Sequence, residues 1–246
     1  MTKKIIWFVV TSLLVSCAKK RNREIKNTLL SNFVEITENE NKGIDEVLDF
    51  YQANCEYFIG FSSSNTEDSK KYFKLKMSNS EKLYLLEEEL EIPASNIAYR
   101  FYKNLENERS NYDEIQTVFI TRDGNEESYV FNRETLDFIH KKATLVNTIL
   151  DSMKLKEYDF LKSTLSTRSY GEHKGRLIKD FKKMDSMYGE ISNYSPLGYK
   201  VYRTKSDLKI LHISGFALRG RQNHALSFYV DFESDKDEIL KIQGEL

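Results

Sequence analysis

The stretch HALSFYVDF, residues 224–232, indicates the fold of the C-terminal half of this 246-residue chain. Leu226, Phe228 and Val230 alternate with smaller or polar side chains. This period of two predicts a strand with one buried face, as in an antiparallel sheet that is covered on one side. Other β-rich runs lie at 199–203, 208–218 and 239–242, and the polar turns TKSD, RGRQN and ESDKD separate the four runs. We therefore expect an antiparallel meander from residue 199 to the C-terminus.

Two helical patterns precede this meander. Apolar residues recur at helical spacing from Leu145 to Leu165, with a break expected near Lys156, and again from Leu177 to Ile191. The segment SNYSPLG, 192–198, is expected to end the second helix. Helices followed by an antiparallel meander predict an α+β fold in which the helices pack on one face of the sheet.

The preceding region also combines helices with β-rich runs. Apolar spacing predicts a helix from about Ile44 to Phe58, which favours a buried structural thiol at Cys55 over a nucleophile. The other expected elements are a polar loop over 61–70, a strand over 72–77, a helix begun by a Ser78/Glu81 capping box, a helix with Pro93 in its first turn and Ile97, Phe101 and Leu105 on its apolar face, and a hairpin that turns at Asp123-Gly124.

The N-terminus has the features of an export signal. A positively charged start, Met1–Lys4, precedes an apolar run from Ile5 to Val15, which ends in Ser16-Cys17. A helix of about eleven residues rises only ~16 Å, too little for a hydrocarbon core of ~30 Å. We therefore expect a cleaved signal peptide rather than a membrane span.

The segment Leu14-Val15-Ser16-Cys17 resembles the lipobox of bacterial lipoproteins. The resemblance covers residues 1–17 and implies that Cys17 receives a diacylglycerol, that cleavage falls between Ser16 and Cys17, and that the new amine is acylated. Two or three acyl chains anchor a protein stably, since each buried methylene contributes about 0.8 kcal/mol. Ala18 in place of aspartate favours the outer membrane, facing the periplasm, under the enterobacterial sorting rule. An ordinary signal peptide with an incidental cysteine is the alternative.

Composition excludes some classes of protein. The formal net charge is −1, and −3 without the two lysines of the signal peptide, which disfavours a nucleic-acid binder. If Cys17 carries lipid, Cys55 has no disulfide partner within the chain. The basic cluster Lys19–Arg23 would contact anionic headgroups or serve as a solvated spacer.

The chain is thus expected to comprise a signal peptide (1–16), a lipidated N-terminus and tether (17–42), an N-terminal α+β domain (43–133) and a C-terminal α+β domain (134–246). The element order over 142–246 resembles that of cystatin-like and nuclear-transport-factor-like α+β domains, which implies that fold for the C-terminal domain. In both domains the helices are expected to pack on antiparallel sheets. Both domains place helices before strands, which leaves open a duplication of one α+β unit.

No catalytic motif, cofactor motif or metal site is predicted. The four histidines lack the i, i+4 spacing of a helical zinc site, and no glycine-rich phosphate loop occurs. His212 and His224 flank the RGRQN turn, and we expect them to face each other across a hairpin. The candidate ligand-binding residues, for an acidic peptide, a glycan or a lipid headgroup, are Arg203, His212, Arg219, Arg221 and His224. Ordinary positive decoration of exposed strands is the alternative.

These observations predict a lipid-anchored protein of the cell envelope. Its partners are expected to be the membrane, through the anchor on Cys17, and an envelope protein, glycan or lipid headgroup. A non-catalytic binding or scaffolding role is favoured. The alternatives are an envelope hydrolase whose site is assembled by the fold and an inhibitory or immunity-type lipoprotein, so the sequence leaves open whether the chain is an enzyme.

Overall fold

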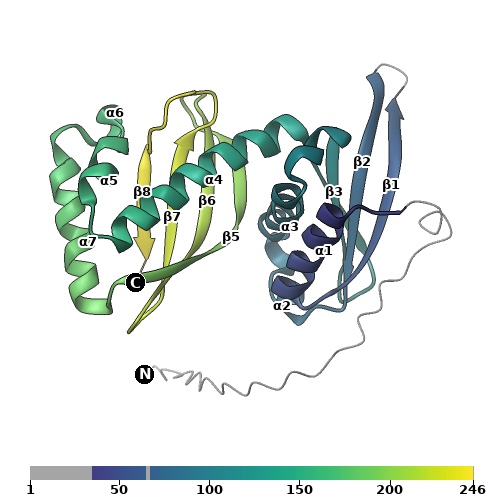
Figure 1. The fold of residues 1–246 in the computed structure, drawn as a ribbon, viewed down its shortest axis with the longest axis horizontal. Helices are drawn as coiled ribbons and strands as arrows, with labels where there is room; N and C mark the ends of the chain where they lie inside the picture. The colour runs from purple at the N-terminus through teal and green to yellow at the C-terminus, as the bar shows by residue number, and fades with distance from the viewer. Residues whose placement is uncertain (1–34, 65–66, 246) are drawn as a thin grey trace, which may run out of the picture.

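The computed structural model describes residues 35–64 and 67–245, and it confirms an α+β fold with two four-stranded sheets (Figure 1). The predicted signal peptide, the lipobox and residues 18–34 of the tether lie outside the described residues. The strands of the first sheet, in spatial order, are β1 (Asn54–Ser64), β2 (Glu67–Ser78), β3 (Glu114–Ile120) and β4 (Glu126–Asn132). Those of the second are β5 (Ile191–Arg203), β6 (Lys209–Arg219), β7 (His224–Asp231) and β8 (Lys241–Glu245).

Seven α-helices accompany the sheets in the described part of the chain. They are α1 (Glu38–Tyr51), α2 (Glu81–Tyr84), α3 (Glu91–Asn104), α4 (Arg133–Lys154), α5 (Tyr158–Thr164), α6 (Thr167–Tyr170) and α7 (Lys174–Tyr188). Three short 3₁₀ segments lie at Glu87–Glu89, Glu106–Asn111 and Gly171–His173.

The first sheet packs its apolar face against α1 and α3 (Figure 1). The alternation expected for 72–77 is confirmed, because Phe73, Leu75 and Met77 are fully buried. The ring of Phe73 lies 4.2 Å from that of Phe101 on α3. One pairing departs from the expected antiparallel sheets, because β2 and β3 run parallel. The long crossover through α2 and α3 makes this possible, since parallel strands need such a connection.

The helix expected from Ile44 to Phe58 is wrong in both bounds. Helix α1 begins at Glu38, where Thr37 and Glu40 form a capping box, and it ends at Tyr51 because Gln52 adopts a left-handed conformation. Residues 38–42, at the end of the expected tether, belong to α1. Cys55 lies on β1 instead of a helix, although its predicted burial is confirmed.

Two further expectations in this half are corrected. The stretch 61–70 is not simply a loop, because β1 extends to Ser64 and β2 begins at Glu67. The cap of α2 is Ser80 rather than Ser78, since the Ser80 hydroxyl accepts a hydrogen bond from the Leu83 amide. The hairpin around Asp123-Gly124 is confirmed as β3 and β4.

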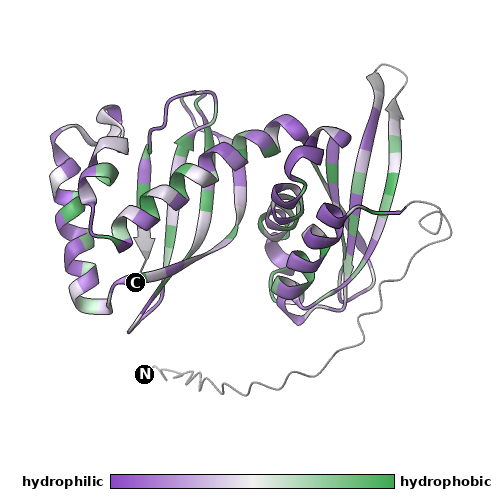
Figure 2. Ribbon diagram, in the orientation of Figure 1, coloured by the Kyte–Doolittle hydropathy of each residue, from purple (hydrophilic) through white to green (hydrophobic). Residues whose placement is uncertain are grey.

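The predicted meander is confirmed, with β5 to β8 antiparallel in chain order. Figure 2 shows hydrophobic and hydrophilic residues alternating along these strands, and the side chains of Leu226, Phe228 and Val230 are fully buried. The break near Lys156 is also confirmed, since α4 ends at Lys154.

The second predicted helix runs too far, to Ile191, and the predicted strand at 199–203 begins later than the observed strand β5. Helix α7 ends at Tyr188, and SNYSPLG belongs to β5 rather than to a helix end. Pro196 is tolerated there because β5 is an edge strand with an irregularity between Pro196 and Gly198.

The two sheets are joined by α3 and α4. Helix α4 follows β4 directly and runs across the second sheet (Figure 1). Helix α3 packs on the edge of β5, where the Ser95 hydroxyl accepts a hydrogen bond from the Tyr199 amide at 2.7 Å. Gly198 permits this approach, because a Cβ there would lie 2.1 Å from the Ile92 carbonyl oxygen. The edge of β5 is thereby covered by the N-terminal half, and buried apolar residues of both halves form one core.

Candidate functional site

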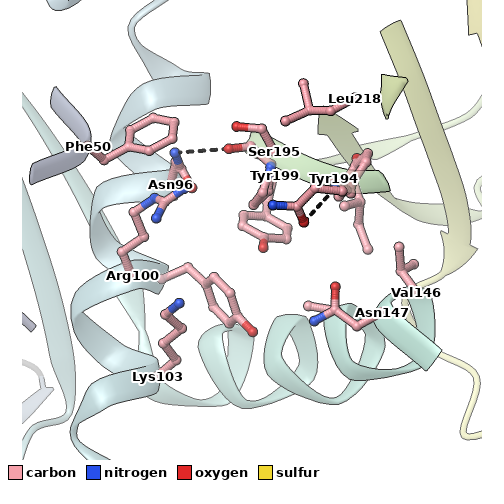
Figure 3. A pocket seen from close by; sticks show the side chains of 15 residues that line it. Phe50, Asn96, Arg100, Lys103, Val146, Asn147, Tyr194, Ser195, Tyr199 and Leu218 are labelled. Carbon is pink, nitrogen blue, oxygen red and sulfur yellow. Dashed lines mark hydrogen bonds between the residues drawn. The ribbon is translucent and has the colours of Figure 1, made fainter. Parts of the chain in front are cut away.

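A cleft of about 440 Å³ lies where α3, α4 and the edge of the second sheet meet (Figure 3). We call it the α3–β5 cleft. Its walls come from four side chains of α3, from Ala143, Val146 and Asn147 of α4, from residues 193–196 and Tyr199 of β5, from Ile213 and Leu218 of β6, and from Phe50 of α1. Five elements distant in the sequence therefore build one site.

The α3 wall consists of Asn96, Tyr99, Arg100 and Lys103. These residues are spaced i, i+3, i+4 and i+7, so they share one face of the helix. The sequence reasoning followed the apolar stripe of the same helix and missed this second face. The signal that could have found it is the regular spacing of the polar and aromatic residues beside the stripe.

The cleft carries two cations that share one carboxylate. Arg100 Nη1 and Lys103 Nζ each lie 2.7 Å from the same oxygen, Oε1, of Glu46 on α1. Burial raises the pKa of Glu46, but the hydrogen bonds from Lys103 and Asn104 and the charges of Lys103 and Arg100 outweigh it, so this pKa is lowered. Glu46 is therefore ionised at neutral pH. No acidic side chain is among those that line the cleft, so its charge is positive.

Hydrogen-bonding capacity remains unused in the α3 wall. Asn96 is fully buried, and its Nδ2 donates to the Tyr51 hydroxyl at 2.8 Å and to the Pro196 carbonyl at 3.4 Å (Figure 3). Its Oδ1 has no partner among the described residues, and neither has Arg100 Nε. Buried polar groups are nearly always hydrogen-bonded, so these two unmet groups are unusual, and both lie in the wall of the cleft.

Aromatic rings among the lining residues contact a cation of the cleft and one another. The Arg100 guanidinium lies 3.7 Å from the ring centroid of Phe50, and the rings of Tyr99 and Tyr199 meet edge to face at 4.8 Å. Burial raises the pKa of Tyr99 to about 12 and that of Tyr199 well above its ordinary value. Both phenols therefore stay protonated at neutral pH and can donate hydrogen bonds.

The five candidate residues from the sequence do not form one site. Arg219 and His224 face the helices and are buried, whereas His212 lies on the opposite face of the sheet. His212 is paired with Tyr229, and His224 with Ala217, so the expectation that the two histidines face each other is wrong. A one-residue difference in register reverses the face on which a side chain lies.

The other two candidates are on the surface. Arg203 lies at the end of β5, where it contacts Asp207 at 3.1 Å and Glu233 at 3.6 Å. Arg221 is exposed in the turn between β6 and β7. His212 stacks on the ring of Tyr229 at 4.6 Å, and burial lowers its pKa.

Arg219 belongs to a buried network that fastens α5 and α7 to the sheet. Its Nη1 donates to Asp185 Oδ1 and to the Gly189 carbonyl, both at 2.5 Å, and Tyr158 donates to the other oxygen of Asp185. Burial, and then the neighbouring Arg219 charge, lowers the pKa of His224. These contacts assign Arg219 a structural role, since its side chain is fully enclosed.

Over residues 35–64 and 67–245, no cluster of three or more histidine, cysteine, aspartate or glutamate side chains could hold a metal ion. In the same ranges, every helix is too short or too polar to cross a membrane. Burial raises the pKa of the Cys55 thiol to about 12, in keeping with a structural thiol. Comparison of the chain with protein-family models, with curated proteins and with solved structures finds no match.

Proposed function

We propose that this protein is a lipid-anchored binding protein of the bacterial cell envelope that holds a small ligand in the α3–β5 cleft. The observation that carries the proposal is the cleft itself. Its volume of about 440 Å³ falls in the range of small-molecule sites, which combine apolar walls with a few convergent polar groups. Here Val146, Ile213 and Leu218 supply apolar wall, and Arg100 and Lys103 supply charge.

The chemistry of the lining favours binding over catalysis. General acid–base catalysis works best with a group whose pKa lies near the operating pH. Burial moves the pKa values of Tyr99 and Tyr199 upward, away from neutrality. The two cations are held by Glu46 and serve as fixed charges. These groups orient a ligand rather than exchange protons with it.

The anchoring part of the proposal is supported by the lipobox-like segment that ends at Cys17. Twenty residues separate Cys17 from Glu38, the first residue of α1. A chain of that length reaches at most ~70 Å when fully extended. An acylated Cys17 would therefore hold the cleft within reach of the membrane surface.

The anchor is tested by comparing the wild type with Cys17→Ser. We expect the wild type in the membrane fraction, with a diacyl-modified N-terminal peptide in mass spectrometry, and Cys17→Ser in the soluble fraction. An unmodified Cys17 in the wild type would overturn the anchored part of the proposal.

The cleft is tested by native mass spectrometry of Cys17→Ser protein isolated from the cells that make it. We expect a co-purifying small molecule that is lost in Asn147→Trp, because this exposed side chain of α4 lines the cleft and tryptophan would fill it. Thr148→Trp is the matched control, since Thr148 is exposed on the same helix outside the lining. Equal ligand content in both variants, or none in the parent, would contradict a ligand-binding cleft.

A further inference from the structure

The charges of the α3–β5 cleft select the kind of ligand, and this inference rests on the function proposed above. Among its lining residues, Arg100 and Lys103 are cations and none is acidic. Glu46, which stands behind this lining, supplies one negative charge for the two positive ones. The site is thus left with a net charge of about +1, which a monoanion would neutralise and a dianion would exceed.

The geometry of the two cations suits a carboxylate. Arg100 Nη1 and Lys103 Nζ already lie 2.7 Å from one carboxylate oxygen, that of Glu46. In the described part of the chain, the contact with Glu46 is the one hydrogen bond that the side chains of Arg100 and Lys103 each donate. Arg100 has five N–H groups and Lys103 three, so most of their donors are unused. Arginine binds carboxylates through two parallel N–H groups, which gives orientation as well as affinity.

The rest of the cleft suits an apolar or aromatic body. Val146, Ile213 and Leu218 are apolar, and the rings of Phe50, Tyr99 and Tyr199 line the same space (Figure 3). No partner for the Tyr199 hydroxyl is seen in the described part of the chain, although its amide is bonded to Ser95. A ligand of about the size of an aromatic amino acid would place rings against rings.

We propose that the α3–β5 cleft binds a small carboxylate with an apolar or aromatic body, its charge held by Arg100 and Lys103. A free organic acid and the C-terminal residue of a peptide share this chemistry. Both sources present one carboxylate beside an apolar group, and they differ in the amide that precedes the C-terminal residue of a peptide.

The test measures binding to full-chain Cys17→Ser protein by isothermal titration calorimetry. The probes are phenylacetate, phenylacetamide, N-acetylphenylalanine and N-acetylphenylalanine amide. We expect each acid to bind at least about tenfold more tightly than its amide, because charge-assisted hydrogen bonds are stronger than neutral ones. A preference for phenylacetate indicates a free acid, and a preference for N-acetylphenylalanine indicates a peptide C-terminus.

Two variants change the charge in opposite directions. Lys103→Gln should remove most of the preference for acid over amide, while Lys179→Gln, an exposed lysine of α7, should keep it. Glu46→Gln should tighten binding of the acids, because it frees both cations from their shared carboxylate. A folding defect cannot produce this gain, so the pair of variants separates charge recognition from stability.

The outcomes separate this inference from the function on which it rests. Equal affinity for acids and amides, or no change in Lys103→Gln, would overturn the carboxylate assignment. If Asn147→Trp still removes a co-purifying molecule, the binding function stands with a ligand of other chemistry. If neither probes nor co-purifying molecules bind, both proposals fail together.

Discussion

The contact between Ser95 and Tyr199 should be a measurable part of the free energy of unfolding. Ser95 is buried, its hydroxyl donates to the Ile92 carbonyl at 2.7 Å, and it accepts from the Tyr199 amide at 2.7 Å. In Ser95→Ala the Tyr199 N–H stays buried without an acceptor. Leaving a buried donor unsatisfied costs about 1–3 kcal/mol. In a protein of this size, each kcal/mol lowers the melting temperature by about 2–4 °C.

Urea unfolding followed by circular dichroism measures this cost, with a lower midpoint and an unchanged slope expected. Ser152→Ala is the matched control, because Ser152 is also buried in a helix but its hydroxyl donates only to Ile149 of the same helix. Its loss should change the free energy by less than about 1 kcal/mol, since alanine favours helices and no donor is orphaned. Equal midpoints for the two variants would refute the idea that Ser95 of α3 supplies the hydrogen-bond acceptor for the Tyr199 amide on the edge of β5.

Three further predictions concern buried positions. The free energy of unfolding should fall as the pH drops below 6.5, because burial lowers the pKa of His140, His212 and His224, so the folded state binds fewer protons than the unfolded one. His224→Leu should make this decline shallower in thermal melts from pH 7.5 to 5, because it removes one of the three contributions. Gly198→Ala should lower the melting temperature in calorimetry because its Cβ would strike the backbone of α3, whereas Gly175→Ala, with open space around it, should not. In Cys17→Ser protein, the Cys55 thiol should react with a disulfide reagent only after unfolding in urea, because burial raises its pKa to about 12 and shields it; reaction in the native state would contradict its burial.

Some of the candidate site could be read from the sequence, but only in hindsight. Asn96, Tyr99, Arg100 and Lys103 repeat at helical spacing, so their common face is a local property. What they face is not local, because the cleft needs β5 to lie against α3. The five residues chosen from the sequence were neighbours along two hairpins. His212 and Arg219 are seven positions apart on β6 and so lie on opposite faces, and the register places His224 beside Ala217 rather than His212.

Periodicity and turn chemistry determined the parts of the fold that the sequence predicted correctly. The alternation around Phe228, the stripe through Phe101 and the Asp123-Gly124 turn each depend on residues close together in the chain. Cys55 shows the limit of such reasoning. The apolar spacing through Tyr51 and Cys55 fits one helix, but α1 ends at Tyr51, and Cys55 lies on β1, where it and Tyr57 are both buried two positions apart.

Only the tertiary structure decided which surfaces meet. The parallel pairing of β2 with β3, the inclusion of Pro196 in an edge strand and the α3–β5 cleft all depend on contacts between distant segments. Such contacts follow from the packing of whole helix and sheet faces, and the free energy of that packing is shared among many residues. The sequence by itself therefore determined the elements with regular apolar spacing, such as the strand around Phe228 and the helix through Phe101, and their buried faces. The packing of α3 on β5 determined where a ligand can bind.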